Sequence, residues 1–312
     1  MGFLMQTVLG ANGQIAVELT RELYRSHTHD IRLVSRHPQK VHDTDELVAA
    51  DLTDAEATSR AVAGSEIAYL TVGLPLDTQL WEEQFPTMMR NVIDACVEHG
   101  TTLVYFDNTY MYPGSTAPQT ESTPFAPNGR KGRVRAEMTA MLLREMEAGR
   151  IDAVICRAPE FYGPGLTRSY TNTLVLDRIK AGKRPLVPVN ADAVRSLIWT
   201  PDASRAMALI GNTPDAYGRT WHLPVDPHRL TYRQLIAVAS EVTGRRIPFT
   251  VLPVAAFRLG SLVSQPLKEM SELLPRYRGD NVFDSSEFTR RFPDFAVTTY
   301  RDGIAQVLGE SR

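Results

Sequence analysis

The sequence has little of what marks secreted, membrane or metal-binding proteins. It holds only two cysteines, Cys96 and Cys156, both within apolar stretches, which predicts buried thiols in a reducing cytoplasm rather than a disulfide. It has no basic segment followed by a long apolar one at its start, and no apolar run long enough to span a membrane. Its seven histidines show no metal-ligand spacing, so we predict no metal site.

The sequence also lacks a strong excess of either charge. The net charge is −2, which gives no reason to expect nucleic acid or an anionic membrane surface as a partner. A hydrophobic content of 43% and a charged content of 22% are typical of a soluble globular protein. A length of 312 residues suits one larger domain and one smaller one.

A strand, a tight turn and a helix are predicted at the start of the chain. The apolar run 3–9 leads into Gly10 and Gly13, and an amphipathic segment containing Ala16 follows. Such a turn brings backbone N–H groups and the positive end of a helix dipole to one point, which suits a nucleotide phosphate. The spacing G-x-x-G-x-x-A also fits an ordinary strand-to-helix turn, but its place at the first strand favours a dinucleotide. The predicted contacts are Gly10, Asn12, Gly13, Gln14 and Ile15.

The end of the second predicted strand bears on the choice of cofactor. Strand 31–35 is followed by Arg36, and no acidic residue appears until Asp43. An acidic residue at this junction holds the ribose hydroxyls of NAD, whereas arginine favours the 2′-phosphate of NADP. The alternative is that Arg36 is a solvated loop charge. We therefore expect NADP, with NAD as the second choice.

Alternating strands and helices predict the fold. The parallel strands should bind ligand at their carboxyl ends, where Asp51 and Leu52 follow the third strand and Val72 and Gly73 end the fourth. We predict a doubly wound parallel Rossmann sheet in residues 1–165, completed by parts of 190–225, and a smaller α/β substrate-binding domain mainly in 166–312. The predicted strands after the second are 47–50, 67–73, 102–106 and 153–157.

The chain resembles the extended and atypical short-chain dehydrogenase/reductases, often labelled NAD-dependent epimerase/dehydratase. The resemblance covers nearly the whole chain and implies Pro159 and Phe161 as residues along the nicotinamide ring. It also implies a possible homodimer through the helices after the fourth and fifth strands, where the sequence shows only ordinary amphipathic patterns. The matching pieces are Gly10-Ala11-Asn12-Gly13, Asp51-Leu52, the runs 157–165 and 198–206, and Leu230-Thr231-Tyr232-Arg233-Gln234-Leu235.

One departure from this family concerns its catalytic pair. Family members use a tyrosine, and a lysine four residues later, to move a proton while hydride passes to or from the nicotinamide. No tyrosine here has lysine four positions later. By register with Glu137, the tyrosine position falls near Gly129 and the lysine position near Arg133. Arginine stays charged and is a poor proton relay, but it can supply a positive field or hold a phosphate.

Other polar residues follow the fifth predicted strand. Tyr110 and Tyr112 are candidates for the missing acid, or they pack against the proline-rich loop that follows. Asn108 either binds the nicotinamide or substrate, or caps its loop. Arg133 belongs to a basic helix start whose charge opposes the helix dipole, so a compensating ligand anion or carboxylate is expected. The candidate catalytic residues are therefore Asn108, Tyr110, Tyr112 and Arg133.

Two functions follow from these residues. The first is an NADP(H)-binding oxidoreductase or epimerase-like enzyme that acts on a small polar molecule, such as a nucleotide sugar or a carbonyl compound. The second is a non-catalytic NADP(H)-binding sensor or regulator of the same fold, which the missing tyrosine and lysine favour.

Overall fold

The computed structural model describes residues 5–165 and 167–309, which form two compact units. The first unit contains the described residues up to Met111, together with Pro127–Ala158 and Ala203–Leu223. The second contains Tyr112–Ala126, Pro159–Asp202 and the described chain from Pro224 onward. Segments 112–126 and 159–165, which the sequence interpretation put in the first domain, therefore belong to the second unit, and Leu166 lies outside the described residues.

The first unit is built on a parallel sheet, as predicted. Among the described residues seven strands pair in the order β11-β6-β5-β4-β1-β2-β3, and all of the pairings are parallel. The order reverses between β1 and β4, which is where ligands bind in open α/β sheets. The strands are β1 Gln6–Leu9, β2 Ile31–Ser35, β3 Glu46–Ala49, β4 Ile67–Leu70, β5 Thr102–Asp107, β6 Ala153–Arg157 and β11 Thr220–His222.

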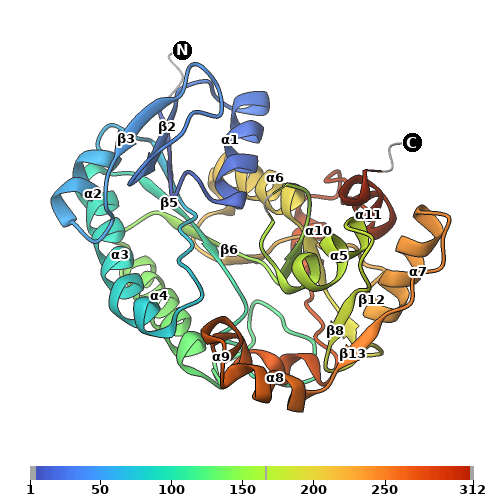
Figure 1. Cartoon of the computed structure of the whole chain (residues 1–312). Coiled ribbons are helices and arrows are strands. Elements are labelled where there is room, and N and C mark those ends of the chain that lie inside the picture. Colours follow the sequence, from blue (N-terminus) through green and yellow to red (C-terminus); the bar gives the residue numbers. More distant parts are fainter. Residues whose placement is uncertain (1–4, 166, 310–312) are drawn as a thin grey trace. The chain divides into compact units, whose positions relative to one another are not determined.

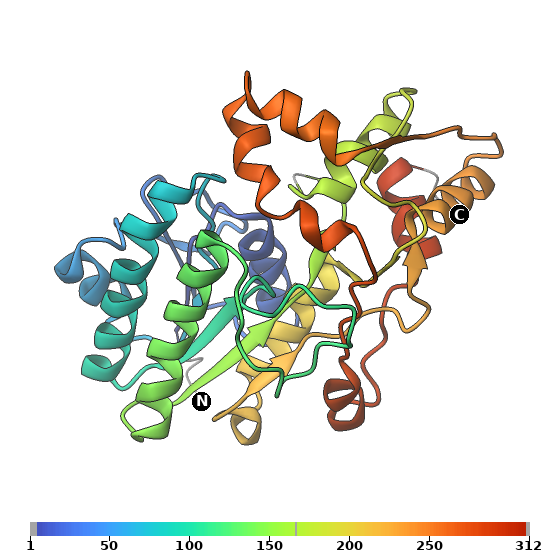
Figure 2. The same cartoon turned by 90° about the horizontal axis from the view of Figure 1, so that it is seen from below.

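Helices cover both faces of this sheet. In Figures 1 and 2, α2, α3 and α4 lie side by side over one face, and Figure 1 shows α1 and α6 together over the other. A core of buried aliphatic and aromatic side chains fills the space between α2–α4 and the sheet. The helices are α1 Gln14–Ser26, α2 Ala55–Val62, α3 Thr78–His99, α4 Arg130–Glu147 and α6 Thr200–Gly211, with a short 3₁₀ turn η2 Pro214–Ala216.

Local sequence sets the ends of these helices. Asp54 and Asp77 begin α2 and α3, since each side chain accepts a hydrogen bond from a backbone N–H in the first turn. Gly100 ends α3 in the left-handed conformation. On α1, buried Ile15 and Leu19 lie on the face toward the sheet.

Two strand predictions differ from the structure at their ends. The fourth strand ends at Leu70 rather than residue 73, so Val72 and Gly73 lie in the loop before α3. That loop contains Pro75, which has no N–H to offer a ladder. Of the predicted strand 3–9, the structure describes β1 from Gln6; Phe3 and Leu4 lie outside the described residues.

The second unit has small paired strands and short helices around its own aromatic core, which includes Tyr162, Trp199 and Tyr300. Strand β10 pairs with β7 and β13 with β8 in parallel, and β12 pairs with β9 antiparallel. The strands are β7 Glu160–Tyr162, β8 Leu186–Pro188, β9 Val194–Arg195, β10 Leu197–Trp199, β12 Leu230–Thr231 and β13 Thr250–Leu252. The helices are η1 Thr171–Leu176 (a π-helix), α5 Asp177–Lys180, α7 Tyr232–Val242, α8 Val254–Ser261, α9 Gln265–Ser271, η3 Leu274–Tyr277 (3₁₀), α10 Ser286–Arg291 and α11 Tyr300–Leu308.

Two further observations bear on the bulk properties. Cys96 and Cys156 are both free and buried, and burial raises the pKa of the Cys96 thiol to about 12. Within 5–165 and 167–309, no helix combines the length and apolar character needed to cross a bilayer.

Candidate functional site

The first turn requires glycine at Gly10 for two reasons. Its φ is +96°, a backbone conformation that side chains disfavour. A Cβ at this position would also lie 2.8 Å from the backbone N and Cα of Val72. Gly10 therefore lets the chain after β1 touch the chain after β4, on either side of the point where the strand order reverses.

The start of α1 is suited to an anion. Gly13 is the N-cap and has no side chain to bond the first N–H groups, and the first turn carries no acidic residue. Ile15 and Ala16, the next residues of that turn, are buried, so their side chains pack into the protein. The N–H groups at the start of a helix and the helix dipole favour a phosphate at this end.

Asn12 lies between the two glycines, and its side chain bonds to the loop after β2. Its Nδ2 donates to the backbone oxygen of His37 at 2.7 Å, and its Oδ1 accepts from the backbone N–H of Gln39 at 3.2 Å. The phosphate turn and the loop carrying Arg36 are thus joined directly.

Arg36 and Asp51 follow neighbouring strands, and the structure brings them together. Ser35 pairs with Ala49 at the ends of β2 and β3, and both charged side chains are exposed. Hydrogen bonds from the N–H and hydroxyl of Thr53 lower the pKa of Asp51, and the charge of Arg36 lowers it further. The buried hydroxyl of Ser35 has no hydrogen-bond partner among residues 5–165 and 167–309.

Two other residues predicted to contact the nucleotide, Gly73 and Leu52, differ in exposure. Gly73 is exposed, and a Cβ there would have no atom of the chain within 4 Å, so a ligand could lie against its backbone. Leu52 is buried, and its backbone oxygen accepts hydrogen bonds from Asn91 and Thr58. The residues present fit a dinucleotide: the glycine turn lies beside the exposed backbone of Gly73, and the Ser35 hydroxyl lacks a partner among the described residues.

Asn108 follows β5 at the same edge of the sheet. Its Oδ1 accepts from the N–H of Tyr110 at 2.9 Å, so the side chain caps its loop, which was the alternative for this residue. The Nδ2 group makes no hydrogen bond to any residue in the described ranges and stays available to a ligand.

A buried ion cluster that the sequence interpretation missed lies at the ends of β5 and β6. Asp107, fully buried, accepts hydrogen bonds from Arg135 at 2.8 Å, from Arg157 at 3.1 Å and from the hydroxyl of Thr139 at 2.9 Å. Burial alone raises the pKa of Asp107, but the two guanidinium groups outweigh it and hold that pKa below its usual range. The sequence contains a signal for this cluster, because one apolar strand ends in Asp107 and the strand beside it ends in Arg157, so the two charges can pair when buried.

The basic start of α4 is compensated by carboxylates. Arg130 forms an exposed ion pair with Glu82, with Nε 2.7 Å from Oε1, and Arg135 bonds Asp107 as described. Lys131 is buried, and its Nζ donates to the hydroxyl of Thr78 at 2.6 Å. Arg133, near which the sequence interpretation puts the family's lysine, is exposed.

The two candidate tyrosines differ in accessibility. Tyr110 is partly exposed and stacks on Trp81, with 6.2 Å between the ring centroids. Its backbone oxygen lies close to Gly132, since a Cβ added to that glycine would be 2.6 Å from the oxygen. Tyr112, in the second unit, is fully buried, with its ring near Phe125 and its backbone oxygen bonded by Arg276. The geometry favours the packing alternative for Tyr112 and leaves Tyr110 as the more accessible of the two.

Pro159 and Phe161 also lie in the second unit, beside a buried polar network. Phe161 is partly exposed on β7, where it pairs with Ile198 of β10. The neighbouring Glu160 accepts from Arg195 at 3.2 Å and from Tyr277 at 2.9 Å. These bonds fix the strand that carries Phe161.

Gln119 is a second residue that the sequence interpretation missed. It is buried in the second unit, and neither its amide oxygen nor its amide nitrogen has a partner there. A lone glutamine in a loop gives no pattern to read, so nothing in the sequence marks it.

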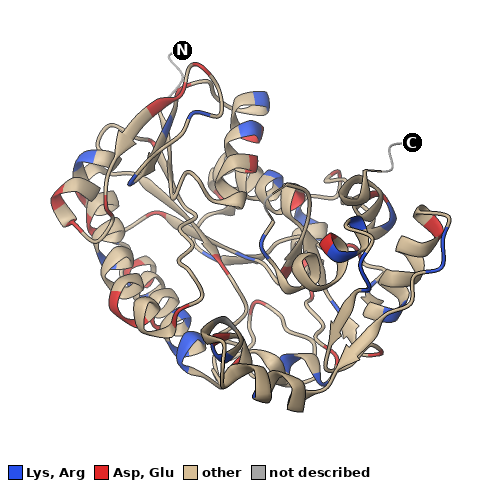
Figure 3. Ribbon diagram, viewed as in Figure 1, with Lys and Arg blue, Asp and Glu red and all other residues tan. Residues whose placement is uncertain are grey.

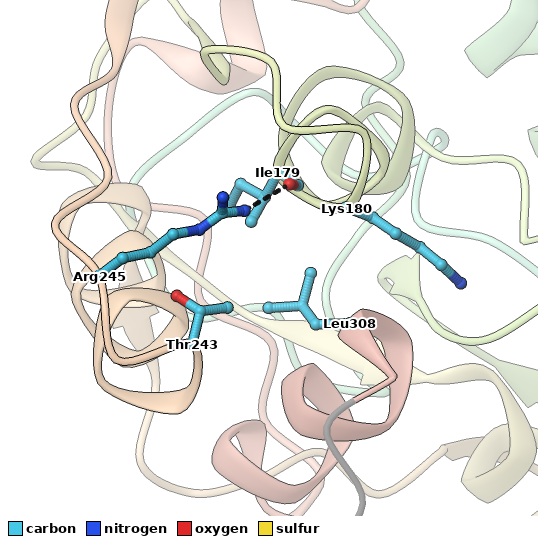
Figure 4. Close-up of a pocket in the computed structure, with 5 residues that line it drawn as sticks. All are labelled: Ile179, Lys180, Thr243, Arg245 and Leu308. Carbon is cyan, nitrogen blue, oxygen red and sulfur yellow. Dashed lines mark hydrogen bonds between the residues drawn. The ribbon is translucent and has the colours of Figure 1, made fainter.

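A cavity lies among residues of the second unit. It has a volume of about 340 Å³ and is lined in part by Lys180 and Arg245. Figure 4 shows Arg245 reaching the backbone oxygen of Ile179, at 3.1 Å, and Lys180 pointing away from the other residues. Figure 3 shows basic and acidic residues interspersed along both units.

Comparison with known proteins gives the family. The fold and the glycine turn are those of a dinucleotide-binding α/β protein. The chain belongs to the NAD dependent epimerase/dehydratase family, whose model matches residues 6–223, so the predicted family and fold class are confirmed. No curated protein sequence matched the chain.

Solved structures share the fold at low sequence identity. UDP-glucuronic acid 4-epimerase from Bacillus cereus, in complex with NAD, is 12% identical with a TM-score of 0.78, and 98% of each chain is covered. UDP-glucose 4-epimerase from Thermus thermophilus, in complex with NAD, is 14% identical with a TM-score of 0.76 and the same coverage. The dTDP-glucose 4,6-dehydratase DesIV from Streptomyces venezuelae, with NAD and TYD bound, is 16% identical, with a TM-score of 0.75 and coverage of 98% and 96%.

Proposed function

We propose that this protein is an NADP(H)-binding, epimerase-like oxidoreductase that acts on a small polar substrate such as a nucleotide sugar or a carbonyl compound. The observation that carries the proposal is the contact of Gly10 with Val72 at the start of an uncapped helix, in a chain of this family. The second unit would bind the substrate. The solved neighbours in complex with NAD support a nicotinamide dinucleotide as the ligand.

The preference for NADP rests on the end of β2. Arg36 is exposed at the end of β2, and its guanidinium is a donor suited to a 2′-phosphate. Asp51 offers the competing interaction with ribose hydroxyls that NAD would use, but its charge is already engaged by Thr53 and Arg36. This arrangement favours NADP over NAD.

Replacing Arg36 by alanine tests this preference. Because one charge-assisted hydrogen bond contributes about 1.5–3 kcal/mol, we expect Arg36→Ala to raise the Kd of NADPH roughly 10- to 100-fold and to change that of NADH little. Titration of nicotinamide fluorescence measures both constants. Arg60→Ala, which removes an exposed arginine from α2, is the matched control. An equal loss for both cofactors would refute the role of Arg36.

The competing function is a non-catalytic NADP(H) sensor. Gly129 and Arg133 stand where the family's tyrosine and lysine are expected, and Tyr112 is fully buried. An enzyme would then need another proton donor, for which Tyr110 is the accessible candidate and Asn108 can hold a substrate or nicotinamide oxygen. Arg133 would contribute a positive field.

Turnover separates the two functions. The protein is mixed with NADPH and a panel of carbonyl compounds, or with NADP⁺ and a panel of nucleotide sugars; nicotinamide absorbance is followed, and the sugars are separated by chromatography to detect epimers. If Tyr110 is the proton donor, Tyr110→Phe lowers kcat by at least about 100-fold and leaves the Kd of NADPH unchanged. Loss of turnover in Tyr112→Phe instead would move the role to Tyr112. Tight NADPH binding with no turnover across the panel supports the sensor.

A further inference from the structure

Asn12 makes a pair of backbone hydrogen bonds of the kind that a neighbouring β-strand would make. Its single planar amide satisfies the oxygen of His37 and the N–H of Gln39, two residues apart on the same loop. Of the common side chains, only asparagine and glutamine carry an amide, whose oxygen accepts while its nitrogen donates. The extra methylene of glutamine would move that group away from the loop.

The loop that Asn12 bonds is the connection between β2 and β3, and it contains no helix. Its far end is held by buried Asp45, which accepts from the N–H groups of Val41 and His42 at 2.9 and 2.7 Å. The ring of His42 also stacks on Tyr24 at 4.0 Å. The near end, which begins at Arg36, is held by Asn12, so the loop is fixed at both ends.

We infer that Asn12 is a positioning residue that determines the preference for NADP. By joining the phosphate turn to residues 37–39, it fixes Arg36 relative to that turn, so that the pyrophosphate and the 2′-phosphate of one ligand meet a single preorganised surface. Without it, binding must order the loop, which weakens affinity. This inference rests on the proposed binding of a dinucleotide at the turn.

The inference predicts an effect on one cofactor more than on the other. Loss of two backbone hydrogen bonds in Asn12→Ala should raise the Kd of NADPH about tenfold. NADH has no 2′-phosphate for Arg36, so its Kd should rise no more than about twofold. Asn12→Asp keeps the acceptor, loses the donor and adds a negative charge near the phosphates, so it should weaken NADPH binding further.

Asn190 provides a matched control in the second unit. Its Nδ2 donates to the backbone oxygen of Arg278 and its Oδ1 accepts from the N–H of Asp192, the same pair of bonds. Asn190→Ala should therefore change neither Kd. Thermal unfolding of each variant without ligand confirms that Asn12→Ala is folded.

A double-mutant cycle tests whether Asn12 acts through Arg36. In an Arg36→Ala background, Asn12→Ala should change the Kd of NADPH no more than it changes that of NADH. Equal weakening of both cofactors by Asn12→Ala, or no weakening of either, overturns the inference while the proposed function stands. If the unchanged protein binds neither NADPH nor NADH, the proposed function fails first, and the inference fails with it.

Discussion

Replacing Asp107 by asparagine is expected to destabilise the first unit by about 3–5 kcal/mol, because it leaves Arg135 and Arg157 buried without a counter-charge. Asparagine keeps the shape of the side chain, so the loss of stability comes from the missing charge and not from a new cavity. Urea unfolding followed by tryptophan fluorescence measures it. The exposed ion pair of Glu82 with Arg130 provides the control, since Glu82→Gln should leave the unfolding midpoint almost unchanged.

The same carboxylate gives a pH dependence with a defined sign. The pKa of Asp107 is lowered in the folded protein from an ordinary value of 3.8. A lowered pKa contributes stability that is present above the unfolded value and is lost as the pH falls through the folded value. The stability difference between wild type and Asp107→Asn should therefore be constant from pH 5 to 8, in round numbers, and shrink below about pH 4. A difference that grows on acidification would contradict the ion cluster.

Replacing Gly10 by alanine is expected to abolish dinucleotide binding. The added Cβ would lie 2.8 Å from backbone atoms of Val72, which cannot rotate away as a flexible side chain would. The turn must therefore shift, and with it the N–H groups that we propose bind the phosphates. We expect the Kd of NADPH to rise at least about 100-fold, measured by fluorescence titration and by loss of the thermal shift that ligand binding produces.

Gly64 supplies the matched control for this substitution. It also has a positive φ, +75°, but a Cβ there would meet nothing within 4 Å. Gly64→Ala should cost about 1–2 kcal/mol of stability through its backbone conformation alone and should leave NADPH binding intact. Wild-type affinity in Gly10→Ala would show that the contact with Val72 does not shape the site.

The architecture of the first unit was predictable because its signals are local. Buried parallel strands appear as short apolar runs, and capping residues such as Asp54 and Asp77 mark where helices begin. The predicted strand ending at residue 73 failed because continued hydrophobicity does not show where pairing stops. The division into units was harder still, since segment 112–126 lies far in sequence from the rest of the second unit.

Parts of the candidate site could be proposed from the sequence, where a single residue stands at the end of a predicted strand. Gly10, Arg36 and Gly73 follow directly from the rule that parallel strands bind ligand at their carboxyl ends. The bonds of Asn12 to residues 37–39 were not predictable, because they join two loops whose approach depends on the pairing of β1 with β2.

The sequence by itself determined that a glycine turn follows the first strand and that no tyrosine has a lysine four residues later. Only the tertiary structure decided that Asp107 neutralises basic residues from α4 and β6, and that Gly10 must be small because Val72 lies against it. The physical reason is the distance along the chain over which each interaction acts. Turn and capping preferences act over a few residues of chain, whereas charge pairing and steric exclusion act between segments that the folded sheet brings together.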